Sequence, residues 1–260
     1  MAHTTSIEIG DSAMPKKGKV RVEQGGKRVR VMLGGVIVAD TSRPLMVWEV
    51  PYFPTYYFPE DDVKTDLLVE TGEVKGSPSR GDATQYAVKV NGSEGRAYRY
   101  LEPEIDALDG HLAFVWDTMD HWFEEEEEVY THARDPNTRI DILPSSRRVR
   151  VEIDGVTVAD TSNGWFLFET GLPTRYYLPK TDVEMSLFTP TDNATHCPYK
   201  GTARYWTATV NGETHENILW GYDTPLPESE RIAGLVAFYN EKVDTYVDEQ
   251  LQERPGTKFS

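Results

Sequence analysis

The sequence is poor in the residues that form crosslinks or hold metals. It contains one cysteine, Cys197, among 260 residues. A single thiol excludes an intramolecular disulfide and a zinc site built from several cysteines. The six histidines show neither His-x-His nor His-x-x-x-His spacing. The sequence therefore predicts no metal site and no bound cofactor.

Long apolar runs and an excess of positive charge are also missing. No stretch approaches the roughly 20 apolar residues that cross a bilayer, and MAHTTSIEIGDSAMPKKGKV at the start lacks the apolar core of a signal peptide. Lys and Arg number 27 against 43 Asp and Glu, a formal net charge of -16. This balance argues against nucleic acid and an anionic membrane as partners. We expect a cytoplasmic protein whose glutamate run at 124–128 is solvated.

The chain is internally duplicated. The segment RVRVMLGGVIVADTS at 28–42 recurs as RVRVEIDGVTVADTS at 148–162, an offset of 120 residues. The same offset aligns YYFPEDDV at 56–63 with YYLPKTDV at 176–183, and it drifts to 122 and then 124 toward the end of each copy. Self-similarity at a nearly fixed offset indicates two tandem copies of one domain.

The duplication and the connecting residues define the predicted boundaries. We predict an N-terminal tail at 1–18, a first copy at 19–130 and a second copy at 139–250. A polar connector containing Pro136 occupies 131–138, and a C-terminal tail follows at 251–260.

The pattern of each copy is typical of β-strands. RVRVEIDGVTVAD alternates charged and β-branched residues around a Gly-containing turn, and YWTATVNGE ends in the Asn-Gly pair of a tight hairpin. LVAFY and KVDTYVD predict two more strands, and PLPESERIAG is the best helix candidate. In the first copy Ile105, Leu108, Leu112 and Val115 also fit a helical stripe.

Five motifs of the second copy occur in an order that resembles a known family. VADT, E…YYLPKTDV, THCPYKGTARYW, LWGYDTP and GLVAFY are similar to the domain-of-unknown-function family 427, and the first copy matches more weakly. The resemblance implies a β-tent fold of two small antiparallel sheets, as in methionine sulfoxide reductase B and the thalidomide-binding domain of cereblon. We thus expect a mainly β protein made of two tandem β-tent-like copies with short helices. The family is also labelled nucleotidyltransferase-like, but the sequence has no Gly-rich phosphate loop and no Asp-x-Asp pair.

Cys197 and Lys200 are the first candidates for a catalytic site. Cys197 precedes Pro198, which favours an extended backbone, and Lys200 follows closely enough to stabilise a thiolate. The alternative for the thiol is burial as a small hydrophobe. Lys200 can bind an anion, form a Schiff base, make a structural ion pair or lie in solvent. The first copy has Ser77 and Arg80 at these positions.

Glu169 is the third catalytic candidate, and like its counterpart Glu49 it lies inside an apolar run. A carboxylate there needs a partner, so it either makes a structural bond or serves as a ligand-orienting group or general base. Tyr177 and its counterpart Tyr57 are candidates to line a cavity, because adjacent tyrosines on a strand face opposite sides. Asp182 is a further candidate for ligand binding, with a turn or cap role as the alternative.

Four aromatic residues complete the predicted ligand-binding set: Tyr205, Trp206, Trp220 and Tyr222. On adjacent antiparallel strands they can form a cage for a flat or cationic ligand, and core packing is the alternative. The first copy has a smaller set without tryptophan, namely Tyr86, Tyr98 and Tyr100.

Three functions are compatible with these residues. The first is binding, with or without transformation, of an unidentified small molecule in an aromatic-lined polar pocket of the second copy. The second is a non-catalytic module that binds a peptide or protein. The third is a thiol-dependent redox enzyme using Cys197, which would need an external thiol to resolve a sulfenic acid. The sequence leaves the ligand and the oligomeric state open.

Overall fold

The structure, a computed structural model, describes residues 20–257. The chain divides after Ala133 into two compact units, and the second unit begins at Arg134. The predicted N-terminal tail at 1–18 lies outside the described residues. Every helix within residues 20–257 is a short 3-10 helix, so strands carry the architecture.

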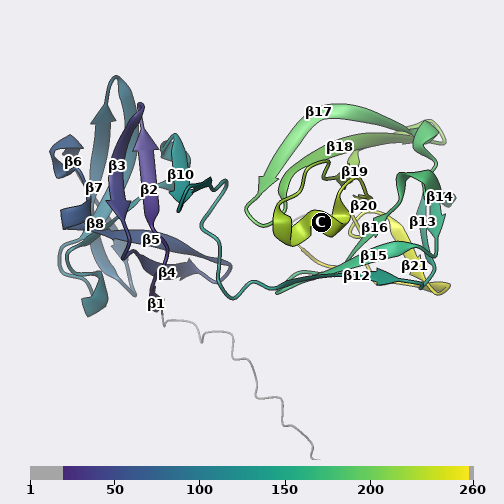
Figure 1. Cartoon of the computed structure of the whole chain (residues 1–260), viewed down its shortest axis with the longest axis horizontal. Helices are drawn as coiled ribbons and strands as arrows, with labels where there is room; N and C mark the ends of the chain where they lie inside the picture. The colour runs from purple at the N-terminus through teal and green to yellow at the C-terminus, as the bar shows by residue number, and fades with distance from the viewer. Residues whose placement is uncertain (1–19, 258–260) are drawn as a thin grey trace, which may run out of the picture. The chain divides into compact units, whose positions relative to one another are not determined.

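The first unit contains a large and a small antiparallel sheet (Figure 1). The large sheet consists of β1 (Arg21–Gln24), β4 (Leu45–Val50), β5 (Phe53–Pro59), β6 (Leu68–Ser77), β7 (Gly81–Val90), β8 (Ser93–Tyr100) and β9 (His111–Phe114). The small sheet consists of β2 (Val29–Leu33), β3 (Val36–Thr41), β10 (His121–Glu124) and β11 (Glu127–Glu128). The 3-10 helices are η1 (Glu60–Asp62), η2 (Thr65–Leu67), η3 (Asp106–Leu108) and η4 (Trp116–Thr118). The strand orders are β1-β4-β5-β9-β8-β7-β6 and β11-β10-β2-β3.

The second unit repeats this architecture. Its large sheet consists of β12 (Ile140–Ser145), β15 (Gly164–Glu169), β16 (Arg175–Leu178), β17 (Phe188–Cys197), β18 (Gly201–Val210), β19 (Glu213–Gly221) and β20 (Val236–Phe238). Its small sheet consists of β13 (Val149–Ile153), β14 (Val156–Thr161), β21 (Asp244–Val247) and β22 (Gln250–Leu251). The 3-10 helices are η5 (Lys180–Asp182), η6 (Met185–Leu187) and η7 (Pro227–Ile232). The large sheet has the order β12-β15-β16-β20-β19-β18-β17, equivalent to that of the first unit, which confirms the prediction of two tandem, mainly β copies.

Each large sheet has apolar clusters on both of its faces. In the second unit, one cluster joins the large sheet to the small sheet and includes Val149, Phe188 and Leu219. The other cluster, on the opposite face, is rich in aromatic residues and includes Tyr177 and Trp220. Figure 1 shows this large sheet strongly curved, with β12 and β17 at its two edges. The candidate site lies on the aromatic-rich face, because that cluster contains the predicted site residues Tyr177 and Trp220.

The predicted hairpins are confirmed in both units. In the second unit β13 and β14 turn at Asp154 and Gly155, whose φ angles are 50° and 75°, and β18 and β19 turn at Asn211 and Gly212, at 51° and 84°. Two consecutive positive φ angles define the primed turn that matches the twist of paired strands. Asn, Asp and Gly tolerate this backbone region, which is why the sequence signals were reliable here.

The helix predictions were too long, because both segments form only short 3-10 helices. PLPESERIAG forms only the six-residue 3-10 helix η7. In the first unit the stripe of Ile105, Leu108, Leu112 and Val115 is divided at Gly110, which has φ 65°. Residues before it form η3, and residues after it form β9, which pairs with β5 and β8. Backbone pairing in the sheet thus overrides a weak helical periodicity.

The expectation that the glutamate run at 124–128 is solvated holds for Glu125, Glu126 and Glu127, which are exposed, but it was wrong for Glu124. The residues of the run form the tight β10–β11 hairpin. The Glu124 side chain is 4% exposed, receives a 2.8 Å hydrogen bond from the Tyr56 hydroxyl and pairs with Lys27 Nζ at 2.5 Å. A buried carboxylate is stable here because hydrogen bonds and a cation replace its hydration.

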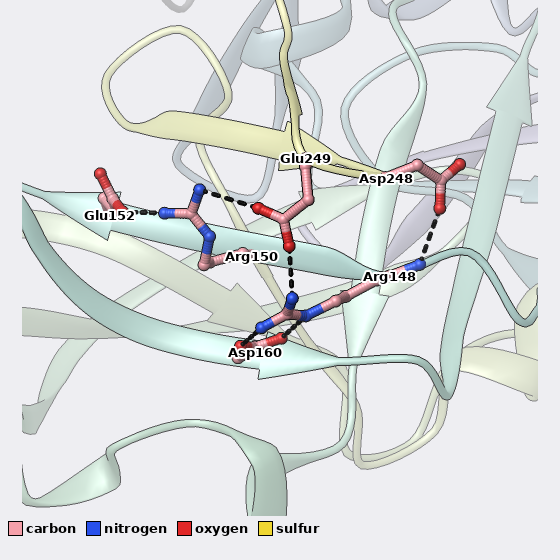
Figure 2. Close-up of polar contacts among 6 residues, drawn as sticks. All are labelled: Arg148, Arg150, Glu152, Asp160, Asp248 and Glu249. Atoms are coloured by element: carbon pink, nitrogen blue, oxygen red, sulfur yellow. Dashed lines mark hydrogen bonds and ion pairs between the residues drawn. The ribbon is translucent and has the colours of Figure 1, made fainter.

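An exposed ion-pair network ties the strands of the small sheet together in the second unit (Figure 2). Arg148 on the edge of β13 makes a two-pronged contact with Asp160 of β14, at 2.8 and 2.5 Å, and a further ion pair with Glu249. Arg150 pairs with Glu152 and lies 3.4 Å from Glu249. The hydrogen bond from Arg148 lowers the pKa of Asp160.

The first unit has an equivalent pair on its small sheet. Arg28 binds Asp40 at 2.7 and 2.5 Å, and Arg30 binds Glu126 at 2.8 Å. Exposed pairs of this kind are screened by water and salt and contribute little to stability individually. We therefore infer that these arginines fix the register of neighbouring strands in the two small sheets.

Candidate functional site

Glu169 and Lys200 form a buried ion pair in the second unit. Glu169 ends β15, and Lys200 lies in the turn that joins β17 to β18. Gly201, at φ 92°, permits this tight turn and returns the chain so that Lys200 Nζ lies 2.5 Å from Glu169 Oε2. The two side chains are 11% and 8% exposed for Lys200 and Glu169. Of the alternatives considered for Lys200, the structure shows the structural ion pair, because the ammonium is partnered and buried.

Tyr177 and Trp220 form the aromatic wall beside this ion pair. Tyr177 of β16 and Trp220 of β19 both pair with Ala237 of β20, so their side chains share one face of the sheet. Their rings are in edge contact at 6.4 Å, and Trp220 Nε1 donates to the Tyr177 hydroxyl at 3.3 Å. Both residues are nearly completely buried.

Tyr222 adds a tyrosine hydroxyl to the same cluster. Its side chain belongs to the aromatic-rich cluster, and the residue is 5% exposed. No residue within 20–257 forms a hydrogen bond with its hydroxyl. Burial, followed by the neighbouring charges of Tyr177, Cys197 and Glu169 in their ionised forms, raises the pKa of Tyr222 well above its usual value. The hydroxyl is therefore a protonated donor among the predicted site residues.

Cys197 is half-buried at the end of β17, opposite Gly201 in the β17–β18 hairpin. Its charge also contributes to the raised pKa of Tyr177, after burial and Glu169, so the thiol belongs to the same neighbourhood. The partner that the structure gives to Lys200 is Glu169. Activation of the thiol by Lys200 stays a prediction.

Tyr205 and Trp206 lie on opposite faces of the sheet, so the predicted four-residue cage was wrong. Tyr205 joins Trp220 and Tyr222 in the aromatic-rich cluster, where its hydroxyl shares a 2.7 Å hydrogen bond with Thr195. Trp206 packs against the cluster between the large and small sheets, with Lys180 Nζ 4.8 Å from its ring centre. Side chains alternate along β18, which separates consecutive residues.

Asp182 fastens η5 to the small sheet. Its Oδ2 accepts a 2.6 Å hydrogen bond from the Thr161 hydroxyl, and the next residue, Val183, bridges Ala159 of β14. Asp62 and Thr41 make the same 2.6 Å contact in the first unit. The turn role considered for Asp182 accounts for these contacts, and the structure does not bring this side chain to the Glu169–Lys200 pair.

The first unit has a carboxylate at the equivalent position, but its hydrogen bonds are satisfied differently. Glu49 Oε1 accepts from the hydroxyls of Tyr57 and Tyr98, the latter at 2.9 Å, and Glu49 Oε2 pairs with Arg80 at 3.5 Å. Arg80 Nε also donates to the Tyr100 hydroxyl at 2.8 Å. Two hydroxyl donors and one guanidinium thus surround the Glu49 carboxylate.

Ser77 and Tyr86, the remaining counterparts in the first unit, take no part in this network. Ser77 lies 3.5 Å from Ser79, hydroxyl to hydroxyl, in the β6–β7 turn. Tyr86 packs on the opposite face of the large sheet, as Trp206 does in the second unit. The duplicated site is therefore smaller than predicted.

One substitution explains the difference between the two carboxylates. Tyr98 of the first unit corresponds to Trp220 of the second, and both are paired with equivalent strands. The indole donates to Tyr177 instead of reaching the carboxylate. Within residues 20–257, Lys200 is the one hydrogen-bond donor to the Glu169 carboxylate. The Glu169 carboxylate can therefore accept further hydrogen bonds, whereas protein groups already donate those that the Glu49 carboxylate accepts.

Sequence reasoning missed Arg175 and Glu241. Arg175 of β16 forms two hydrogen bonds with Glu241, at 2.7 and 2.6 Å, and its guanidinium lies 5.5 Å from the Trp220 ring centre. The first copy has Thr55 at the position of Arg175. A comparison of the two copies would therefore have identified Arg175 as specific to the second copy. The Thr257 hydroxyl donates to Glu241 at 2.5 Å, within the segment expected to be a tail.

The fold and site define a tandem, mainly β protein with one carboxylate–cation pair in each copy, half-buried in the first and buried in the second. Residues 21–125 and 141–249 both match the family described as domain of unknown function (DUF427), also designated NTP_transf_9. The chain belongs to this family, which confirms the resemblance in the sequence motifs. A comparison with curated proteins gives no match.

The described residues were also searched for membrane spans and metal sites. Within 20–257, no helix combines the length and apolar character that a membrane crossing needs. In the same range, no group of three or more His, Cys, Asp or Glu side chains is arranged to hold a metal ion.

Proposed function

We propose that the second unit binds a small polar molecule beside Glu169, Lys200 and Tyr222, and that the first unit serves as its scaffold. The observation that carries this proposal is the Tyr222 side chain, which is 5% exposed and whose hydroxyl makes no hydrogen bond within residues 20–257. A ligand that accepts a hydrogen bond from this hydroxyl gains the free energy of one hydrogen bond.

The neighbouring groups suit a ligand that both donates and accepts hydrogen bonds. The Glu169 carboxylate has one protein donor, whereas that of Glu49 has two hydrogen-bond donors and an ion pair with Arg80, so a ligand N–H or O–H can bind the second carboxylate. The opposite charges of Lys200 and Glu169 balance, which favours a ligand without a large net charge.

The proposal also covers the setting of this site. We propose a cytoplasmic protein whose partners are small molecules, and the net charge of -16 supports this by disfavouring nucleic acid and anionic membranes. Whether the bound molecule is transformed depends on Cys197. If a Cys197→Ser variant keeps every ligand-induced shift and every turnover of the parent, covalent thiol chemistry is excluded.

A melting screen of the full chain with nucleotides, cyclic imides, sulfoxides and carboxylates tests the proposal. We expect at least one class to raise the melting temperature, because a ligand that binds only the folded state stabilises it. Tyr222→Phe is then expected to weaken that ligand about five- to tenfold, the value of one hydrogen bond, with no loss of folding stability.

Tyr100→Phe in the first unit is the matched control. The Tyr100 hydroxyl accepts from Arg80, so this variant is expected to lose about 1 kcal/mol of stability and to keep the affinity for the ligand. No shift with any class, together with recovery of a stable protein partner, would favour the interaction module. Equal affinity of the parent and Tyr222→Phe would contradict the assigned site.

A further inference from the structure

In the first unit, a hollow of about 170 Å³ lies on the face of the large sheet opposite to the Glu49 network. Its lining residues come from η1, η2 and four strands, and they are Glu60, Thr65, Leu68, Tyr86, Arg99 and Leu112. Tyr86 was predicted to belong to the ligand site of the first copy, but it lines this hollow instead. The hollow is therefore separate from the network around Glu49.

The second unit carries larger side chains at two of the equivalent positions, and smaller ones, Gly221 and Val236, at those of Arg99 and Leu112. Leu68 is replaced by Phe188 and Tyr86 by Trp206, and each pair occupies the same register in its hairpin. Phe188 is 7% exposed and Trp206 packs against the same core cluster. The second unit thus places two aromatic rings where the first unit has Leu68 and Tyr86.

The walls of the hollow combine an apolar floor with a neutral polar rim. Leu68 and Leu112 belong to the adjoining core cluster. At the rim, Arg99 Nη1 pairs with Glu60 Oε1 at 2.6 Å, so opposite charges balance. Arg99 Nε is buried and has no hydrogen-bond partner among the described residues. The Tyr86 hydroxyl also makes no hydrogen bond within residues 20–257.

We propose that this hollow is a second binding site, which takes a small uncharged aromatic molecule with one hydroxyl or ring N–H. The ring would occupy the space that Phe188 and Trp206 fill in the second unit, against Leu68 and Leu112. Its polar group would bind at Tyr86 and the Arg99–Glu60 pair, where a charged ligand would meet a group of its own sign. This site does not depend on the proposed function of the second unit.

Phenol and indole are suitable probes, with benzoate and benzylamine as charged analogues. Saturation-transfer NMR of the full chain is expected to give a dissociation constant for phenol in about the millimolar range, as a ligand of this size allows. The charged analogues are expected to bind more weakly. No saturable binding of phenol or indole, or equal binding of the charged analogues, would overturn the proposal.

The second unit itself supplies the test variant. Leu68→Phe combined with Tyr86→Trp introduces its side chains and is expected to weaken phenol binding by roughly tenfold or more, because the space is filled. Tyr86→Trp alone serves if the double variant folds poorly. Val69→Phe is the control, since Val69 is 48% exposed and does not line the hollow. Unchanged affinity in the filled variants, or an equal loss in the control, would contradict the site.

Discussion

Glu241→Ala is expected to destabilise the second unit by about 3–5 kcal/mol, because it leaves a buried guanidinium without its counter-ion. The Glu241 side chain has no exposed surface, and that of Arg175 is 10% exposed. The lost carboxylate also accepts from Thr257, so a second hydrogen bond disappears with it. This is the largest stability effect that we expect from a single ion pair in the described chain.

The lone thiol gives a specific measurement of this effect. Cys197 belongs to the second unit, so its reaction with a thiol reagent across a urea gradient reports the unfolding of that unit. The control replaces both partners, as Arg175→Met with Glu241→Leu, and is expected to restore most of the stability because no charge stays unpaired. A loss below about 1 kcal/mol for Glu241→Ala would assign the pair a role other than stability.

The same pair predicts a dependence on pH. Burial alone raises the pKa of Glu241, but the hydrogen bonds from Arg175 and Thr257 outweigh it, and the net pKa is lowered. A group with a lowered folded pKa contributes stability that is complete above its unfolded pKa, about 4.3 for Glu. We therefore expect the stability difference between the parent and Glu241→Ala to shrink as the pH falls below that value.

Glu169→Ala is expected to cost about 3 kcal/mol, since the Lys200 ammonium is left buried and unpaired. Replacing both partners, as Glu169→Gln with Lys200→Met, is expected to recover most of this loss. The same thiol-labelling experiment measures both variants. If Glu169→Ala and the double variant are equally stable, Lys200 finds another partner, and the assignment of a buried ion pair is contradicted.

The duplication made much of the fold predictable. Asp-Gly and Asn-Gly pairs located the hairpins, because few residues accept their positive φ angles. The offset between the copies matched Glu49 to Glu169, Arg80 to Lys200 and Tyr98 to Trp220 before any coordinates were known. These matches follow from the sequence offset, and the equivalent strand pairing of the two units places the matched residues at equivalent positions.

The contacts of the site were less predictable. Lys200 meets Glu169 across 31 residues, and Arg175 meets Glu241 across 66, so each pairing depends on the register of several strands. The misplacement of Trp206 had a simpler cause. Consecutive residues of a strand face opposite sides, and Tyr205 and Trp206 had been grouped in one cage.

Exchanging the aromatic residue that distinguishes the two sites is the most direct test of the account. We would measure calorimetrically the affinity for the probe that gives the largest melting shift, using the parent, Trp220→Tyr and Tyr98→Trp. Trp220→Tyr is expected to supply Glu169 with the hydroxyl that Glu49 receives from Tyr98, and to weaken the probe about tenfold. Tyr98→Trp is expected to leave the affinity unchanged. Unaltered binding by Trp220→Tyr, or a loss confined to Tyr98→Trp, would contradict a working site in the second unit.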